Sequence, residues 1–190
     1  MPQQNTNISL YQESQAKDNC GFGLIVNRYG TQNRDVVTRS IDGLTSMTHR
    51  GAIGADGKTG DGCGLLFDLN QTFFQKQIKK EFKIKLPELF GIAQIFSSVA
   101  LKKYLPAIKS ILQSENLVFE CVREVPINTS VLGEIALESL PKINQIFITP
   151  ISKDFNKERF ESCLLQARKK IEELHNNDEK LYICSMSSQT

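Results

Sequence analysis

The sequence predicts an α+β protein, and three observations support this fold class. Short apolar segments with strand character alternate with longer segments of helical periodicity along most of the chain. The 190 residues are 40% hydrophobic and 23% charged, which is typical of a globular chain with a sizeable core. No internal repeat and no linker divides the sequence, so we expect one domain or a piece of a larger one.

The first third of the chain begins with polar residues. Residues 1–17 are rich in Gln, Asn and Ser, which predicts a disordered leader. A strand is expected over residues 20–26, a short apolar run punctuated by glycine. Polar residues 27–35, with Gly30 among them, predict a turn. The apolar positions of residues 36–47 are close to a helical stripe. A loop follows, and its glycines are Gly54, Gly57, Gly60, Gly62 and Gly64.

The remaining elements alternate between strands and helices. The predicted strands span residues 65–69, 90–96, 117–122, 145–149 and 181–185. The predicted helices span residues 71–82, 101–114, 131–140 and 157–174. Asn70 can cap the first of these helices, and Pro141 ends the third. The last helix has the clearest apolar face, formed by Phe160, Cys163, Leu164, Ala167, Ile171 and Leu174.

The charge balance excludes two classes of partner. The chain has 23 basic and 21 acidic residues mixed along its length, with a formal charge of +2. This balance predicts no nucleic-acid partner and no anionic membrane partner. The leader has neither the apolar core of a secretory signal nor the arginines of a mitochondrial one, and it carries Glu13 and Asp18. No segment is apolar enough for a membrane helix, so a cytoplasmic location is expected.

The five cysteines stand at positions 20, 63, 121, 163 and 184. Their number is odd and no two form a C-x-x-C pair, so we expect neither a disulfide framework nor a structural zinc site. The sequence thus predicts no metal in this chain. Apart from Cys20, the cysteines are expected to behave as small buried hydrophobic residues.

Cys20 lies in the most unusual local sequence, Asp-Asn-Cys-Gly-Phe-Gly at residues 18–23. Glycines on both sides of Phe22 let the backbone pass close to another group. A cysteine at the start of such a strand is either a small packed residue or a side chain that meets a ligand at the rim. His49 is the histidine that could serve such a cysteine as a base, and it could equally cap the end of its helix.

Two rival sites in the glycine-rich loop fail on their required residues. A phosphate-binding loop needs a glycine where Ala52 stands, and a strand, not a helix, before the loop. A calcium loop needs oxygen-bearing side chains at the positions of Lys58 and Gly60. Asp56 and Asp61 are instead expected to bond their own turns.

Three blocks in register resemble the glutamate synthase large-subunit family. Residues 18–23 resemble the start of mature members of that family. Leu-Thr-Ser-Met-Thr-His-Arg-Gly-Ala at 44–52 follows, and then Gly-Ala-Asp and Thr-Gly-Asp-Gly at 54–56 and 59–62, in the right order and at plausible distances. Looser matches lie at residues 131–136 and 145–148. The resemblance covers most of the chain after residue 17.

This resemblance implies a class II glutamine amidotransferase with the four-layer αββα sandwich of N-terminal nucleophile hydrolases. Residues 1–19 would be a leader, and residues 20–190 the N-terminal portion of that domain, truncated at the C terminus. Cys20 would become the first residue and the nucleophile, with its α-amine as base. The substrate would be glutamine, hydrolysed to glutamate and ammonia. Arg50 would support the pocket, or form a salt bridge at its helix end.

The chain departs from the family pattern in two ways. Cys63 stands where a small residue such as alanine is expected. No position matches the family's oxyanion Asn-Gly pair, or the Arg and Asp that grip glutamine. FMN, an iron–sulfur cluster and NADPH or ferredoxin are implied for the full-length parent, and no cofactor for this chain. We therefore expect an incomplete fragment. The alternatives are half of a split amidotransferase, partnered by the remaining part of glutamate synthase, or a non-catalytic binding or regulatory module.

Overall fold

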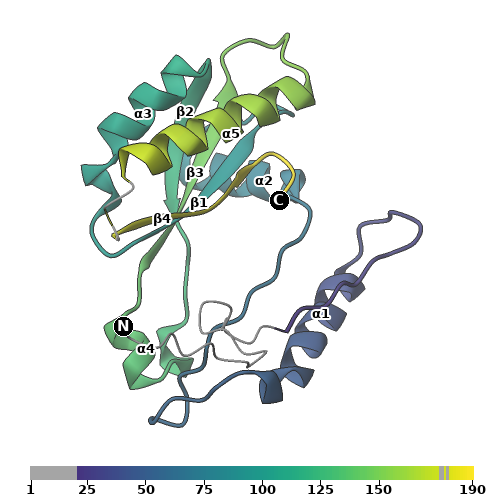
Figure 1. Ribbon diagram of the computed structural model, residues 1–190. Coiled ribbons are helices and arrows are strands. Elements are labelled where there is room, and N and C mark those ends of the chain that lie inside the picture. The colour runs from purple at the N-terminus through teal and green to yellow at the C-terminus, as the bar shows by residue number, and fades with distance from the viewer. Residues whose placement is uncertain (1–20, 176–177, 179) are drawn as a thin grey trace, which may run out of the picture. The chain divides into compact units, whose positions relative to one another are not determined.

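A computed structural model describes residues 21–175, 178 and 180–190, and it combines helices with an antiparallel sheet (Figure 1). The α+β class is therefore confirmed. The chain divides into two compact units, one up to Leu65 and one from Leu66 onward. The predicted leader and Cys20 lie outside the described residues.

The first unit contains helix α1 (Arg34–Ser46) and the short 3-10 helix η2 (Thr48–Arg50). Asn33 caps α1, because its side chain accepts a hydrogen bond of 2.9 Å from the backbone N–H of Asp35. The predicted turn is confirmed: the N–H of Gly30 donates to the carbonyl of Asn27 at 2.9 Å, and Gly30 has a φ of +67°. A left-handed backbone there favours glycine.

The second unit carries the sheet. Its strands are β1 (Gly91–Ser97), β2 (Leu117–Glu124), β3 (Lys142–Pro150) and β4 (Leu181–Ser187). Its helices are α2 (Gln71–Phe82), η3 (Leu101–Lys103), α3 (Leu105–Ser114), η4 (Thr129–Val131), α4 (Glu134–Glu138) and α5 (Lys157–Leu174). The strand order is β2-β3-β1-β4, and all neighbours are antiparallel. The segments β1-α3-β2 and β3-α5-β4 thus form the two interleaved halves of a split βαβ arrangement.

Helices cover both faces of this sheet, as alternate residues of the central strands show. Ala93 and Ile146 lie in the larger core cluster, which includes α3 and α5, whereas Ile92 and Phe147 lie in a second cluster with Ile78 of α2. Successive side chains of a strand point to opposite faces. The sheet is therefore packed between α3 and α5 on one side and α2 on the other.

The predicted face of α5 forms the centre of the larger core. Phe160, Leu164, Ala167 and Ile171 are buried, Cys163 is partly buried, and Leu174 is exposed at the end of the helix. Burying each large apolar side chain contributes roughly 1.5–3 kcal/mol. Asn156 caps this helix by accepting from the N–H of Arg159 at 2.8 Å, and its bounds match the sequence prediction.

Three predicted elements differ from the structure. No strand forms over residues 21–26 or 65–69, and the helix expected over 131–140 is reduced to α4. Apolar sequence favours an extended backbone, but a strand exists only where a second strand accepts and donates its hydrogen bonds. Phe22 is 91% exposed, so these segments lack the packing that would hold them in a sheet.

Candidate functional site

The backbone that follows Cys20 packs against the His-Arg-Gly block. A Cβ atom placed on Gly21 would lie 3.4 Å from the sulfur of Met47 and 3.7 Å from the Cβ of Arg50. Residue 21 therefore passes close to the end of α1, as its lack of a side chain allows. The adjoining Cys20 lies outside the described residues.

Arg50 is held by the turn that ends α1. Its N–H donates to the carbonyl of Met47 at 2.8 Å, which keeps the turn tight. Nδ1 of His49 lies 3.0 Å from the carbonyl oxygen of Ser46. Because a carbonyl can only accept, this contact requires a proton on Nδ1. His49 thus caps the helix end, which is the structural one of the two interpretations that the sequence left open.

The loop after Arg50 is a small hairpin closed by aspartates. Asp61 accepts a hydrogen bond from the N–H of Ala52 at 2.8 Å, and a β-bridge joins Ile53 to Gly60. Near the tip, Asp56 accepts from the N–H of Thr59 at 2.8 Å. The prediction that these aspartates bond their own turns is confirmed for Asp56, whereas Asp61 accepts from an amide nine residues earlier, across the neck of the hairpin. Their carboxylates fix the chain that leaves Arg50.

The described part of the chain combines Gly21, Met47 and Arg50, with Asp61 holding the next residues. Met47 had no predicted role at the site. Its spacing was an available signal, because a residue three positions before Arg50 falls on the same side of a helical turn. The contact itself spans 26 residues, from 21 to 47, and no local pattern reports it.

The described cysteines differ in burial, so the prediction that they are buried is only partly right. Cys121 is buried and Cys163 partly buried, but Cys63 and Cys184 are exposed, which corrects the expectation for those two. Burial raises the pKa of the Cys121 thiol to about 11, and the nearby carboxylates of Glu120 and Glu81 add to this shift. Since the thiolate is the reactive form, Cys121 is a poor nucleophile near neutral pH.

Two kinds of feature are absent from the described residues. Within residues 21–175, 178 and 180–190, no three His, Cys, Asp or Glu side chains gather as a metal site would require. Over the same residues, no helix has the length and apolar character needed to cross a membrane.

Comparison with known proteins gives one family. The sequence profile of the class-II glutamine amidotransferases matches residues 20–190, so the match begins at the cysteine singled out by its sequence context. The large chain of NADPH glutamate synthase from Azospirillum brasilense is 32% identical over 191 residues, covering 97% of this chain. That from Bacillus subtilis is 34% identical over 95% of the chain. The ferredoxin-dependent glutamate synthase of Pyropia yezoensis is 33% identical over 96% of it. This chain spans 12% of the length of each of these relatives.

Proposed function

The chain belongs to the class II glutamine amidotransferases, and on that premise we propose that it supplies the nucleophile end of a glutamine-hydrolysing site. The observation that carries the proposal is that the family match begins at residue 20, directly before the backbone that packs on Met47 and Arg50. Glutamate synthases are similar along nearly all of the chain. The proposed role is the release of ammonia from glutamine for glutamate synthesis.

In the proposed mechanism, removal of residues 1–19 makes Cys20 the first residue. Its new α-amine, with an ordinary pKa of about 8, takes the proton of the thiol. The thiolate attacks the side-chain amide carbon of glutamine, and the nitrogen leaves as ammonia with the transferred proton. Water then cleaves the thioester, which yields glutamate and regenerates the thiol. Each bond that breaks is thus balanced by one that forms.

Arg50 has a positioning role in this proposal. Its Cβ and Cγ lie 3.7 and 3.8 Å from a Cβ atom placed on Gly21, so the start of its side chain approaches the residue that follows Cys20. The hydrogen bond from Ala52 to Asp61 fixes the backbone on the other side of Arg50. With the base of its side chain positioned in this way, Arg50 can order the pocket through the five donors of its guanidinium.

The donors for the oxyanion are proposed to come from elsewhere in the parent enzyme. No position of this chain matches the family's Asn-Gly pair, and an oxyanion needs such preorganised donors. We therefore expect low glutaminase activity from the chain alone and a gain when the remaining part of glutamate synthase is added. In the complete four-layer sandwich, residues 21–26 and 65–69 would gain strand partners.

The proposal is tested by the intact mass of the purified chain and by alkylation with an electrophilic glutamine analogue. We expect a mass lacking residues 1–19 and a thioether on Cys20. Cys20→Ala should abolish both results. Cys63→Ala is the matched control, since Cys63 is an exposed cysteine that lies just after the hairpin. A full-length mass without labelling of Cys20 would refute the proposal and favour a non-catalytic binding module.

A further inference from the structure

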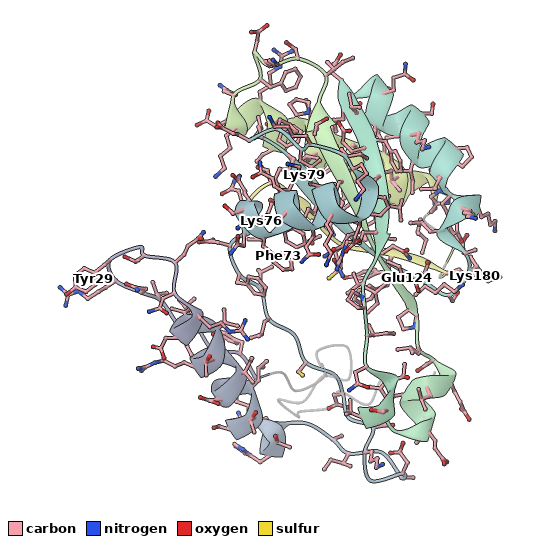
Figure 2. All side chains as sticks on the ribbon, turned by 180° about the vertical axis from the view of Figure 1, so that it is seen from behind. Tyr29, Phe73, Lys76, Lys79, Glu124 and Lys180 are labelled. Carbon is pink, nitrogen blue, oxygen red and sulfur yellow. The ribbon has the colours of Figure 1, made fainter. Side chains whose placement is uncertain are left out.

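The outward face of α2 carries a concentration of positive charge that no ion pair of the described residues balances. Lys76, Lys79, Lys80 and Lys83 line one shallow hollow of about 490 Å³. We call these four residues, together with Phe73, the α2 basic face. All five side chains are exposed. Figure 2 shows Phe73, Lys76 and Lys79 along the side of the helix that faces the viewer.

The acidic residue of the same helix forms an ion pair with a residue outside this face. Glu81 forms an ion pair with Arg123 of β2, at 3.2 Å. Among the ion pairs of the described residues, none includes a lysine of the α2 basic face. The ammonium of Lys83 instead donates to the carbonyl of Lys80 at 3.2 Å. The positive charge of this face therefore has no carboxylate opposite it in the described part of the chain.

The spacing of these lysines is unfavourable for the helix alone. Lys76 and Lys80 are four residues apart within the helix, and like charges at that spacing destabilise a helix by a few tenths of a kcal/mol per pair. The helix dipole favours the lysines of the last turn, Lys79 and Lys80, but its effect falls off before Lys76. An external anion would relieve this repulsion.

The composition of the face indicates what kind of anion fits. It contains no arginine, which is the residue suited to bidentate phosphate contacts, and a single aromatic ring, so it resembles neither a nucleic-acid groove nor a stacking platform. From Phe73 to Lys80 the helix rises about 10 Å, which matches two turns of a facing helix. Phe73 is 46% exposed and provides an apolar contact at one end.

We propose that the α2 basic face is a docking surface for an acidic segment of a partner protein. Ammonium groups opposite carboxylates would steer the encounter, and Phe73 would add apolar contact area. Binding through exposed charges is weakened by salt, because the Debye length shortens as ionic strength rises. This inference is independent of the proposed glutaminase chemistry, because it concerns α2 and none of the residues around Gly21.

The test uses a fluorescent Glu-rich helical peptide as the acidic probe, titrated with the purified chain at low and high salt. We expect salt-sensitive binding that falls about tenfold in the variant Lys76→Glu/Lys80→Glu/Lys83→Glu. The control Lys102→Glu/Lys142→Glu/Lys153→Glu makes the same change in net charge at exposed lysines of other elements and should bind normally. The neutral variant Lys76→Gln/Lys80→Gln/Lys83→Gln keeps good helix formers and should show a smaller loss.

Zero-length carbodiimide cross-linking identifies the lysines that meet the probe. Cross-links concentrated on Lys76, Lys79, Lys80 and Lys83 would support the docking surface. Equal losses in the test and control variants, or cross-links spread over the lysines of the chain, would overturn it. So would tighter binding of a DNA oligonucleotide or of phosphatidylserine vesicles than of the peptide. Self-association abolished by the α2 substitutions would assign the face to a second copy of the chain and refute a separate partner.

Discussion

The two compact units of the chain differ in how their structure is held. None of the described residues from 21 to 65 is buried, and the order there comes from turns, caps and the two aspartates of the hairpin. In the unit from Leu66 onward, two apolar clusters fill both faces of a four-stranded sheet. The free energy of unfolding should therefore come mainly from the second unit, since hydrophobic burial is the largest favourable term in folding.

The residues of the proposed site and the residues that stabilise the fold therefore lie in different parts of the sequence. The residues of the proposed site, Arg50 and its neighbours, stand in the unit that lacks a core of its own. Binding and catalytic residues are common on loops that a rigid scaffold supports. Substitutions around Arg50 should thus change local order, while substitutions in α5 or β1 should change global stability.

The largest effect is expected from truncating a core side chain of α5. Leu164→Ala should lower the free energy of unfolding by about 2–5 kcal/mol, because Leu164 is fully buried in the larger cluster. The adjacent Leu165 is 49% exposed, and Leu165→Ala should stay within about 0.5 kcal/mol. Urea denaturation compares the two variants. Equal losses of the free energy of unfolding in the two variants would show that the structure assigns the wrong face of α5 to the core.

Glycine-to-alanine substitutions should have opposite signs in the two units. A Cβ on Gly91 would lie 2.8 Å from Leu164 and 3.2 Å from the carbonyl of Ser187, so Gly91→Ala should cost about 1–3 kcal/mol. Gly43 lies inside α1 with open space around it, and Gly43→Ala should stabilise that helix by about 0.5–1 kcal/mol. The midpoints of urea unfolding for Gly91→Ala and the helix content of both variants test this. Destabilisation by both substitutions would contradict the contrast.

A smaller and more local effect is expected in the hairpin after Arg50. Asp61→Ala removes the acceptor for the N–H of Ala52, a loss of about 1 kcal/mol, so that amide should exchange about fivefold faster with deuterium. Asp61→Asn keeps one acceptor oxygen and should exchange at an intermediate rate. Amides of α5 serve as the internal control and should not change. Faster exchange across both units would mean that Asp61 supports global stability, contrary to the comparison.

The elements that the sequence predicts correctly are those whose causes are local. Helix 157–174 follows from its apolar period, and the start of α2 from the cap at Asn70, whose side chain accepts from Phe73 at 3.0 Å. The role of Asp56 was likewise predictable, because its hydrogen bonds reach only two and three residues along the chain. Local signals decide such elements before any distant segment is considered.

The features that the sequence does not predict depend on distant contacts. Residues 21–26 and 65–69 have strand-like composition, but composition does not supply a partner strand. The approach of Gly21 to Met47 and Arg50 joins positions far apart along the chain. The exposure of Cys63 and Cys184 follows from their places in a loop and an edge strand, which residue type alone does not reveal. The sequence therefore indicates candidate residues for the proposed site, but not how they are arranged.

The smallest expected effect concerns pH and the second unit. The hydroxyl of Tyr104 donates to the carboxylate of Asp178 at 2.7 Å, and this bond raises the pKa of Tyr104 above 10.0 and lowers the pKa of Asp178 below 3.8. A depressed carboxyl pKa gives stability that is present above 3.8 and lost as pH falls through the lower, folded value. The raised phenol pKa gives stability that is present below 10.0 and lost as pH rises through the higher, folded value.

The difference in the free energy of unfolding between the protein and Tyr104→Phe should thus be constant between these two pH limits and shrink outside them. Tyr182→Phe removes an exposed hydroxyl and serves as the control. A stability difference for Tyr104→Phe that does not change with pH would contradict the link between this hydrogen bond and the two pKa values.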